Sequence, residues 1–61
     1  MEVLGQFESR TQARAAREKM ARELGARLDF GEDVYRYERD GQQRLLRVVQ
    51  GGKNNWQVVL E

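Results

Sequence analysis

The chain has 61 residues, and folding of so short a chain buries only about 60% of the surface it exposes when unfolded, so its core is thin. It contains neither Cys nor His, which excludes a disulfide framework and a zinc site of the usual kind. Lys and Arg number 11 and Asp and Glu 10, a net charge of +1, too balanced for a protein that mainly coats nucleic-acid phosphates. We expect one domain over residues 1–61, for which self-association is the remaining way to gain stability.

The chain opens with a short alternating pattern that predicts a strand over residues 2–7. Val3, Gly5 and Phe7 alternate with Glu2, Leu4 and Gln6, a short pattern that suits a first strand. Gly5 either marks a bulge in this strand or allows a close approach of the backbone.

A helix is predicted from Ser9 to about Leu24. Ser9 and Gln12 have the spacing of a capping box, in which the serine hydroxyl accepts the Gln12 amide and the Gln12 side chain reaches back. Gly25 stands where a helix is expected to end. The apolar positions expected to share one face of this helix are Ala13, Ala16, Met20 and Leu24.

After Gly25 the apolar period changes from 3.6 to 2, which predicts strands. The expected elements are a strand beginning near Leu28, a turn at residues 31–33, a strand over 34–39, a hairpin turn at Asp40-Gly41, a strand over 45–50, a loop over 51–55 and a last strand over 56–61. The order is β-α-β-β-β, with the second strand broken or bulged at Gly31. The expected fold class is α+β, with one helix packed on one face of a mainly antiparallel sheet.

Both sides of the late strands carry apolar residues, although one helix covers only one face. Leu45 and Val49 point to one side, and Leu46 and Val48 to the other. A large apolar patch is seldom left in water, so the second face needs an explanation. Three explanations remain open: strand twist or a bulge, an interface with another copy, and a ligand groove. If the face is an interface, its candidate residues are either Leu45 and Val49 or Leu46 and Val48.

No catalytic constellation is evident, and we expect a protein that is not an enzyme. Without His or Cys, Ser9 has no activating base and is better explained as a helix cap. The carboxylates near turns do not match a metal-binding loop; they are Glu32, Asp33, Glu38 and Asp40. Gly51-Gly52-Lys53 lacks the spacing of a phosphate-binding loop. No cofactor, metal site or small-molecule substrate is indicated.

Basic residues cluster on the predicted helix. Arg10, Arg14 and Arg17 lie beside the apolar stripe and could form an anion-binding edge near the helix start. The alternative is a solvated face stabilised by i,i+4 pairs such as Arg14–Glu18 and Glu18–Arg22.

A second candidate binding site combines aromatic and Arg side chains from the strands. Aromatic rings on a sheet interleaved with Arg are typical of modules that stack single-stranded bases or sugars. The alternative is that the rings complete a thin core and the Arg side chains line its rim. The residues concerned are Tyr35, Tyr37, Trp56, Arg36, Arg44 and Arg47.

The stretch from Val3 to Ala13, continuing through Ala16 and Met20, resembles the opening of the sporulation-related repeat (SPOR) family. In that family a strand leads through a Ser into a helix with small residues, and the sheet of its two β-α-β halves binds peptidoglycan glycan strands. The resemblance covers about the first 25 residues and implies the same strand, cap and helix. After Gly25 the chain departs from the family pattern, with no second helix and no second copy of the motif, and no binding residue is carried over.

These features favour a small non-enzymatic interaction module, a homodimer that occludes or bridges a macromolecular partner. The partner would be a protein or a second copy, and the alternative function is nucleic-acid binding through Arg and aromatic residues. Uncharged runs are far shorter than the ~18 apolar residues of a membrane span. Residues 1–4 have no feature of a signal peptide, so we expect a cytoplasmic protein that does not bind membranes.

Overall fold

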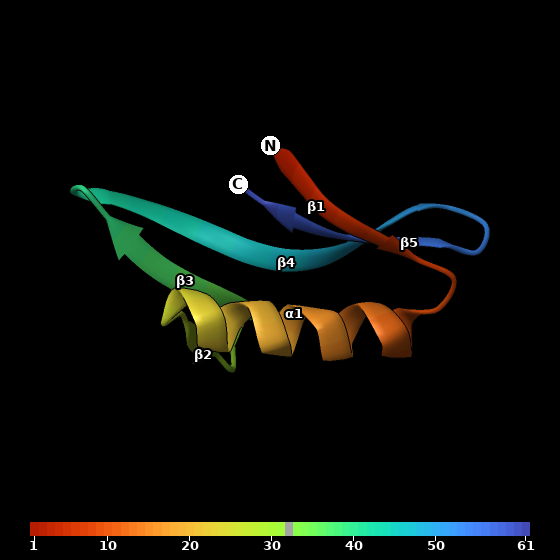
Figure 1. Ribbon diagram of the computed structural model, residues 1–61, viewed down its shortest axis with the longest axis horizontal. Coiled ribbons are helices and arrows are strands. Elements are labelled where there is room, and N and C mark those ends of the chain that lie inside the picture. Colours follow the sequence, from red (N-terminus) through yellow and green to blue (C-terminus); the bar gives the residue numbers. More distant parts are fainter. Residues whose placement is uncertain (32) are drawn as a thin grey trace.

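The computed structural model describes residues 1–31 and 33–61, and it places one helix against one face of an antiparallel sheet (Figure 1). The elements in chain order are β1 (Glu2–Phe7), α1 (Arg10–Leu24), β2 (Arg27–Asp29), β3 (Val34–Arg39), β4 (Gln42–Gly52) and β5 (Asn55–Leu60). The strands lie in the order β1-β5-β4-β3-β2, so β4 is central. The predicted α+β architecture is confirmed.

The second predicted strand is interrupted after Asp29, as the glycine at position 31 suggested. β2 contains only three residues and pairs with the first half of β3, which gives five strands instead of four. The Asp29 carboxylate accepts the Gly31 amide at 3.0 Å, which stabilises the turn locally. Glu32, expected in this turn, lies outside the described residues.

Both ends of α1 are capped by local sequence. Ser9 has an extended backbone, and its hydroxyl accepts the Gln12 amide at 3.1 Å, as the capping box predicts. At the other end Gly25 adopts φ 72°, and the Ala26 amide donates to the Ala21 carbonyl at 2.9 Å. This six-to-one bond is the signature of a Schellman motif, for which the left-handed Gly25 is suited.

Replacement of Ser9 by Ala is expected to lower the free energy of unfolding by about 0.5–2 kcal/mol, because the Gln12 amide loses its acceptor. Chemical denaturation monitored by circular dichroism measures the change. Thr11→Ala is the matched control, since Thr11 is exposed and Ala is the better helix former. Equal effects of the two substitutions would contradict the cap.

Two tight turns join the late strands. At Asp40-Gly41 both residues have positive φ, 54° and 78°, as a type I′ hairpin requires, and this prediction is confirmed. The predicted loop over 51–55 is wrong, because β4 continues to Gly52 and β5 begins at Asn55. A register shift after Gln50 and a left-handed Asn54 (φ 56°) allow this shorter connection.

The core lies between α1 and the central strands. Its buried members are Ala13, Ala21, Leu46, Val58 and Leu60. Met20 and Ala16 pack against them as expected, but Leu24 is exposed. The prediction for Leu24 is wrong because the buried line of α1 follows residues four apart, Ala13, Arg17 and Ala21, and the helix ends before that line reaches another apolar residue.

Gly5 lies at a bulge in β1 and also allows a close approach between the backbone and a side chain. The pairing of β1 with β5 shifts register between Val3 and Gly5, which is a bulge. A Cβ at Gly5 would lie 3.0 Å from the Phe7 ring, so the backbone of Gly5 and this ring approach closely and a larger residue would require the ring to shift.

Candidate interaction surface

The sheet has one face that α1 does not cover (Figure 1). Strand alternation and register assign to this open face the residues Val3, Arg27, Asp29, Val34, Arg36, Leu45, Arg47, Val49, Gln57, Val59 and Glu61. No helix of the described residues lies above this face, and it combines apolar and charged side chains.

Two valines on the open face are fully buried, although no helix lies over them. Val34 is 1% exposed and Val59 is 0% exposed. Arg47 lies directly opposite Val59 on β4 and forms an ion pair with Glu61, which is two residues beyond Val59 on the same side, at 3.3 Å. The methylene stem of an arginine can cover an apolar neighbour while its charged end stays in water.

Val34 has a matching arrangement at the other side of the sheet. Asp29 lies directly opposite Val34 on β2 and pairs with Arg36, two residues beyond Val34, at 3.0 Å. Both charged side chains are about one-third exposed. Each buried valine therefore has a diagonal cross-strand ion pair beside it, so charged side chains supply part of the cover that a second helix would give.

Between these two ion pairs lies Leu45, on the central strand. It is opposite Arg36 on β3, and on the β5 side it exchanges two backbone hydrogen bonds with Glu61, at 3.2 and 2.8 Å. Leu45 is only half-buried, as is Val49, and Val3 at the β1 edge is 46% exposed. Leu45 thus projects from the middle of the open face with a cation on one side and an anion on the other.

The structure assigns the two apolar pairs of β4 to different surroundings. Leu46 is fully buried beneath α1, and Val48 packs against the same core. They are therefore not available for an interface, and that alternative for these two residues is wrong. Leu45 and Val49 remain as the pair on the open face.

The predicted aromatic and Arg site is not assembled. Tyr35, Tyr37 and Trp56 pack on the helix side of the sheet, against the core. Arg36 and Arg47 project from the open face, where each has an acidic partner. Because neighbouring strand residues point to opposite faces, Arg36 and Arg47 are separated from the rings, whereas Arg44 lies on the same face as Tyr37. The interpretation of these rings as part of a thin core agrees with the structure.

Arg44 lies opposite Tyr37 and donates from Nε to the Glu61 carbonyl at 3.5 Å. It does not join the Arg residues of the open face.

The basic edge of α1 meets an acidic residue of the chain itself. Arg17 is 4% exposed; it donates to the Asp33 carbonyl at 2.9 Å and to the Asp33 carboxylate at 3.2 Å. Its guanidinium also lies 5.2 Å from the centre of the Tyr35 ring. Arg14 reaches the same carboxylate at 3.5 Å. Arg14 and Arg17 therefore fasten the β2–β3 turn to the helix, and Arg10 is exposed.

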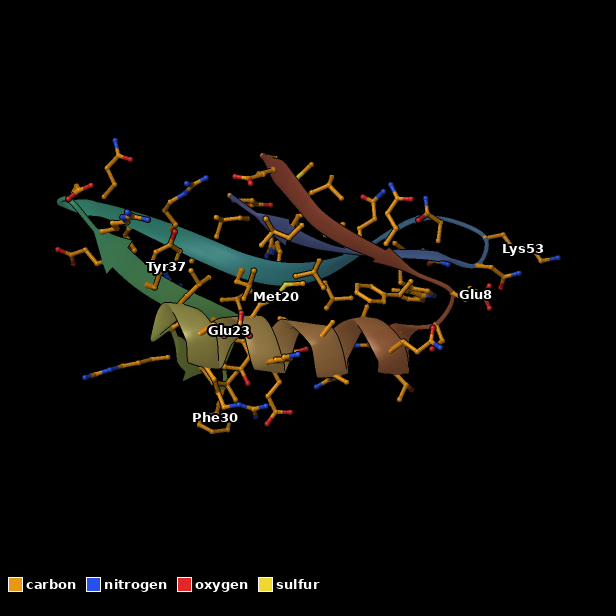
Figure 2. All side chains as sticks on the ribbon, in the orientation of Figure 1. Glu8, Met20, Glu23, Phe30, Tyr37 and Lys53 are labelled. Carbon is orange, nitrogen blue, oxygen red and sulfur yellow. The ribbon has the colours of Figure 1, made fainter. Side chains whose placement is uncertain are left out.

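One prominent residue was absent from the sequence-based candidates. Phe30 is 88% exposed, just beyond the end of β2. Figure 2 shows its ring projecting away from the sheet, below the turn that follows β2. Its position next to Gly31 was the available signal, because a side chain at a turn is seldom covered.

The described residues contain no group of three or more His, Cys, Asp or Glu side chains that could hold a metal ion. No helix within residues 1–31 and 33–61 is long and apolar enough to cross a membrane.

No protein-family model, curated protein or solved structure matches the chain. Its function is therefore inferred from its own surfaces.

Proposed function

We propose that this protein is a small non-catalytic interaction module that pairs with a second copy through the open face of its sheet and, as a pair, occludes or bridges a macromolecular partner. The proposal rests on the spatial order of three side chains across the middle of this face, which is Arg36, Leu45 and Glu61. An apolar side chain stands between opposite charges on the central strand.

A two-fold axis along β4, lying between two copies stacked face to face, makes this arrangement complementary to itself. The rotation exchanges the two sides of the central strand, so that Arg36 of one copy faces Glu61 of the other while the two Leu45 side chains meet. Val34 and Val59 stand on opposite sides of β4 and exchange in the same way. Arg47 faces its counterpart, and each keeps its own Glu61 as a counter-ion.

The edges of the sheet are less suited to association than the face. β1 carries a bulge at one edge, and β2 at the other edge is only three residues long. Bulges and very short edge strands are devices that discourage edge-to-edge pairing. The open face is therefore the preferred surface for a second copy.

Sedimentation equilibrium of the protein and of Leu45→Lys tests the proposal. We expect a dimer at high micromolar concentration for the unchanged protein and a folded monomer for Leu45→Lys. Unlike Arg47, which keeps Glu61 as its counter-ion, the two new ammonium groups would be buried at the two-fold axis without counter-ions of their own. The apparent melting temperature of the unchanged protein should also rise with concentration.

Ala15→Lys is the matched control, since Ala15 is exposed on α1, away from the sheet, and this variant should remain dimeric. A monomeric unchanged protein throughout the concentration range would overturn the proposed pairing.

A further inference from the structure

The apolar centre of the open face does not by itself fix how a second copy lies on it. Leu45 is on the central strand, and two copies stacked face to face can bring their Leu45 side chains together in two ways. With a two-fold axis along β4 the two β4 strands run in the same direction, and with an axis across the strands they run in opposite directions. The charged residues beside Leu45 distinguish these two orientations.

An axis across the strands would place each side of the sheet over the same side of the other copy. Arg36, which is opposite Leu45 on β3, would then face Arg36 of the other copy, and Glu61, on the β5 side, would face Glu61. Arg27 continues the same row on β2 and would also meet its own counterpart. Like charges directly opposite one another destabilise a contact, so the charges disfavour this orientation.

An axis along β4 exchanges the two sides of the sheet, so that each Arg36 faces a Glu61 of the other copy. Within one copy Arg36 is paired with Asp29 at 3.0 Å, and Glu61 with Arg47 at 3.3 Å. Pairing in this orientation would join these two ion pairs into one row of alternating charge that crosses between the copies, in the order Asp29, Arg36, Glu61 and Arg47. The symmetry produces this row twice, and it places a Glu61 beside each of the two Arg47 side chains that meet at the axis.

The two buried valines of the open face favour the same orientation. Val34 and Val59 lie on the two sides of β4, one row further along the sheet than Leu45. An axis along β4 brings each of them over the other, apolar against apolar. An axis across the strands at Leu45 would instead place Val34 over Glu38 of the other copy, because Glu38 lies on β3 one row to the other side of Leu45.

From these arrangements we infer that Arg36 and Glu61 are the specificity-determining residues of the open face, which select a second copy of this chain with its β4 parallel to that of the first. Both β3–β4 hairpins, which extend beyond the C-terminal end of α1 in Figure 1, then project from the same end of the pair. The inference rests on the proposed pairing and adds to it the residues that select the partner and its direction.

Charge reversal followed by sedimentation equilibrium tests the selection of the partner. Arg36→Glu and Glu61→Arg, each alone, should dimerise about tenfold more weakly than the unchanged protein or worse, because each brings two pairs of like charges together. An equimolar mixture should form a dimer with one copy of each variant, in which both contacts are again between opposite charges. The new repulsion inside each variant, with Asp29 or with Arg47, is the same alone and in the mixture, so the mixture isolates the contact between copies. Lys53→Glu, an exposed charge reversal at the turn between β4 and β5, is the control and should dimerise like the unchanged protein.

The distance between two spin labels tests the orientation without altering the open face. The chain contains no Cys, so Lys53→Cys provides a single attachment point on each copy. From the rise of a strand and the spacing of stacked sheets, the labels should lie within about 25 Å of each other in the parallel orientation, and about 50 Å apart for an axis across the strands at Leu45. Circular dichroism checks that the charge variants are folded, and the label distance decides the orientation if one of them is not.

The inference is overturned, with the pairing itself left in place, if the unchanged protein is dimeric and the two folded charge variants dimerise equally well. It is also overturned if their mixture does not associate, or if the labels in the dimer lie about 50 Å apart. A monomeric unchanged protein would instead overturn the proposed pairing, and the inference with it.

Discussion

Leu46→Lys is expected to unfold the protein, whereas the same change at the adjacent Leu45 should leave it folded. Leu46 is fully buried beneath α1, and a Lys there loses the packing of the leucine and has no acidic partner in the core. The expected loss exceeds about 4 kcal/mol, comparable with the whole stability that a core of this size supplies. At the half-buried Leu45 an ammonium group can reach water, and the loss should stay within about 1 kcal/mol.

Far-UV circular dichroism and thermal melts of the two variants measure this contrast. Leu46→Met separates charge from shape, because it nearly conserves volume and should cost less than about 1.5 kcal/mol. A folded Leu46→Lys, or an unfolded Leu45→Lys, would mean that the helix covers the other face of β4.

The second large effect is expected at Asp33, which accepts hydrogen bonds from the buried guanidinium of Arg17. Asp33→Asn keeps a residue that tolerates the left-handed backbone at this position (φ 54°) but removes the counter-charge. Because the Arg17 side chain is only 5% exposed, its charge is left buried and uncompensated, and we expect a loss of about 1–3 kcal/mol in the free energy of unfolding. Asp33 itself is half-exposed, so its own loss of charge contributes little.

A double-mutant cycle with Arg17→Met isolates this effect by denaturant titration. Arg17→Met alone should change stability by no more than about 1 kcal/mol, because an apolar chain of similar length replaces the buried cation, whose Nε has no hydrogen-bond partner among residues 1–31 and 33–61. In the Arg17→Met background, Asp33→Asn should be nearly neutral.

Arg14→Met is the matched control, since the half-exposed Arg14 contacts the same Asp33 carboxylate. It should cost less than about 0.5 kcal/mol. If Asp33→Asn is equally costly with Arg17 present and absent, the buried ion pair is not what holds the turn.

Strand twist, an interface and a ligand groove were the predicted explanations for the second face. The structure adds another, in which charged side chains lie beside its buried valines. Val34 and Val59 are buried with ion pairs beside them, Asp29 with Arg36 and Arg47 with Glu61. Hydropathy patterns count such residues as polar, yet the long apolar stem of an arginine also covers a neighbour. The apolar residues of this face that stay partly or fully exposed are Leu45, Val49 and Val3, and Leu45 is the one on the central strand between the two ion pairs.

The local sequence by itself determined the helix, the hairpin turn and the bounds of the strands 2–7 and 34–39. Ser9 and Gln12 start the helix, Gly25 ends it, and Asp40-Gly41 closes a hairpin, each through bonds or backbone angles within a few residues. The alternation that separates Val58 from Val59 was also readable, because side chains on a strand point to opposite faces whatever the strand contacts.

Only the tertiary structure decided which face of β4 the helix covers. Leu45 and Leu46 are the same residue type at adjacent positions, so propensity and hydropathy cannot rank them. The burial of Arg17 likewise depended on Asp33, sixteen residues away, whose carboxylate and carbonyl make a buried cation tolerable. Phe30 became exposed because its strand ended one residue before it. For β4 and for Arg17 the deciding partner is distant along the chain, and a pattern along the sequence reflects only the interactions of near neighbours.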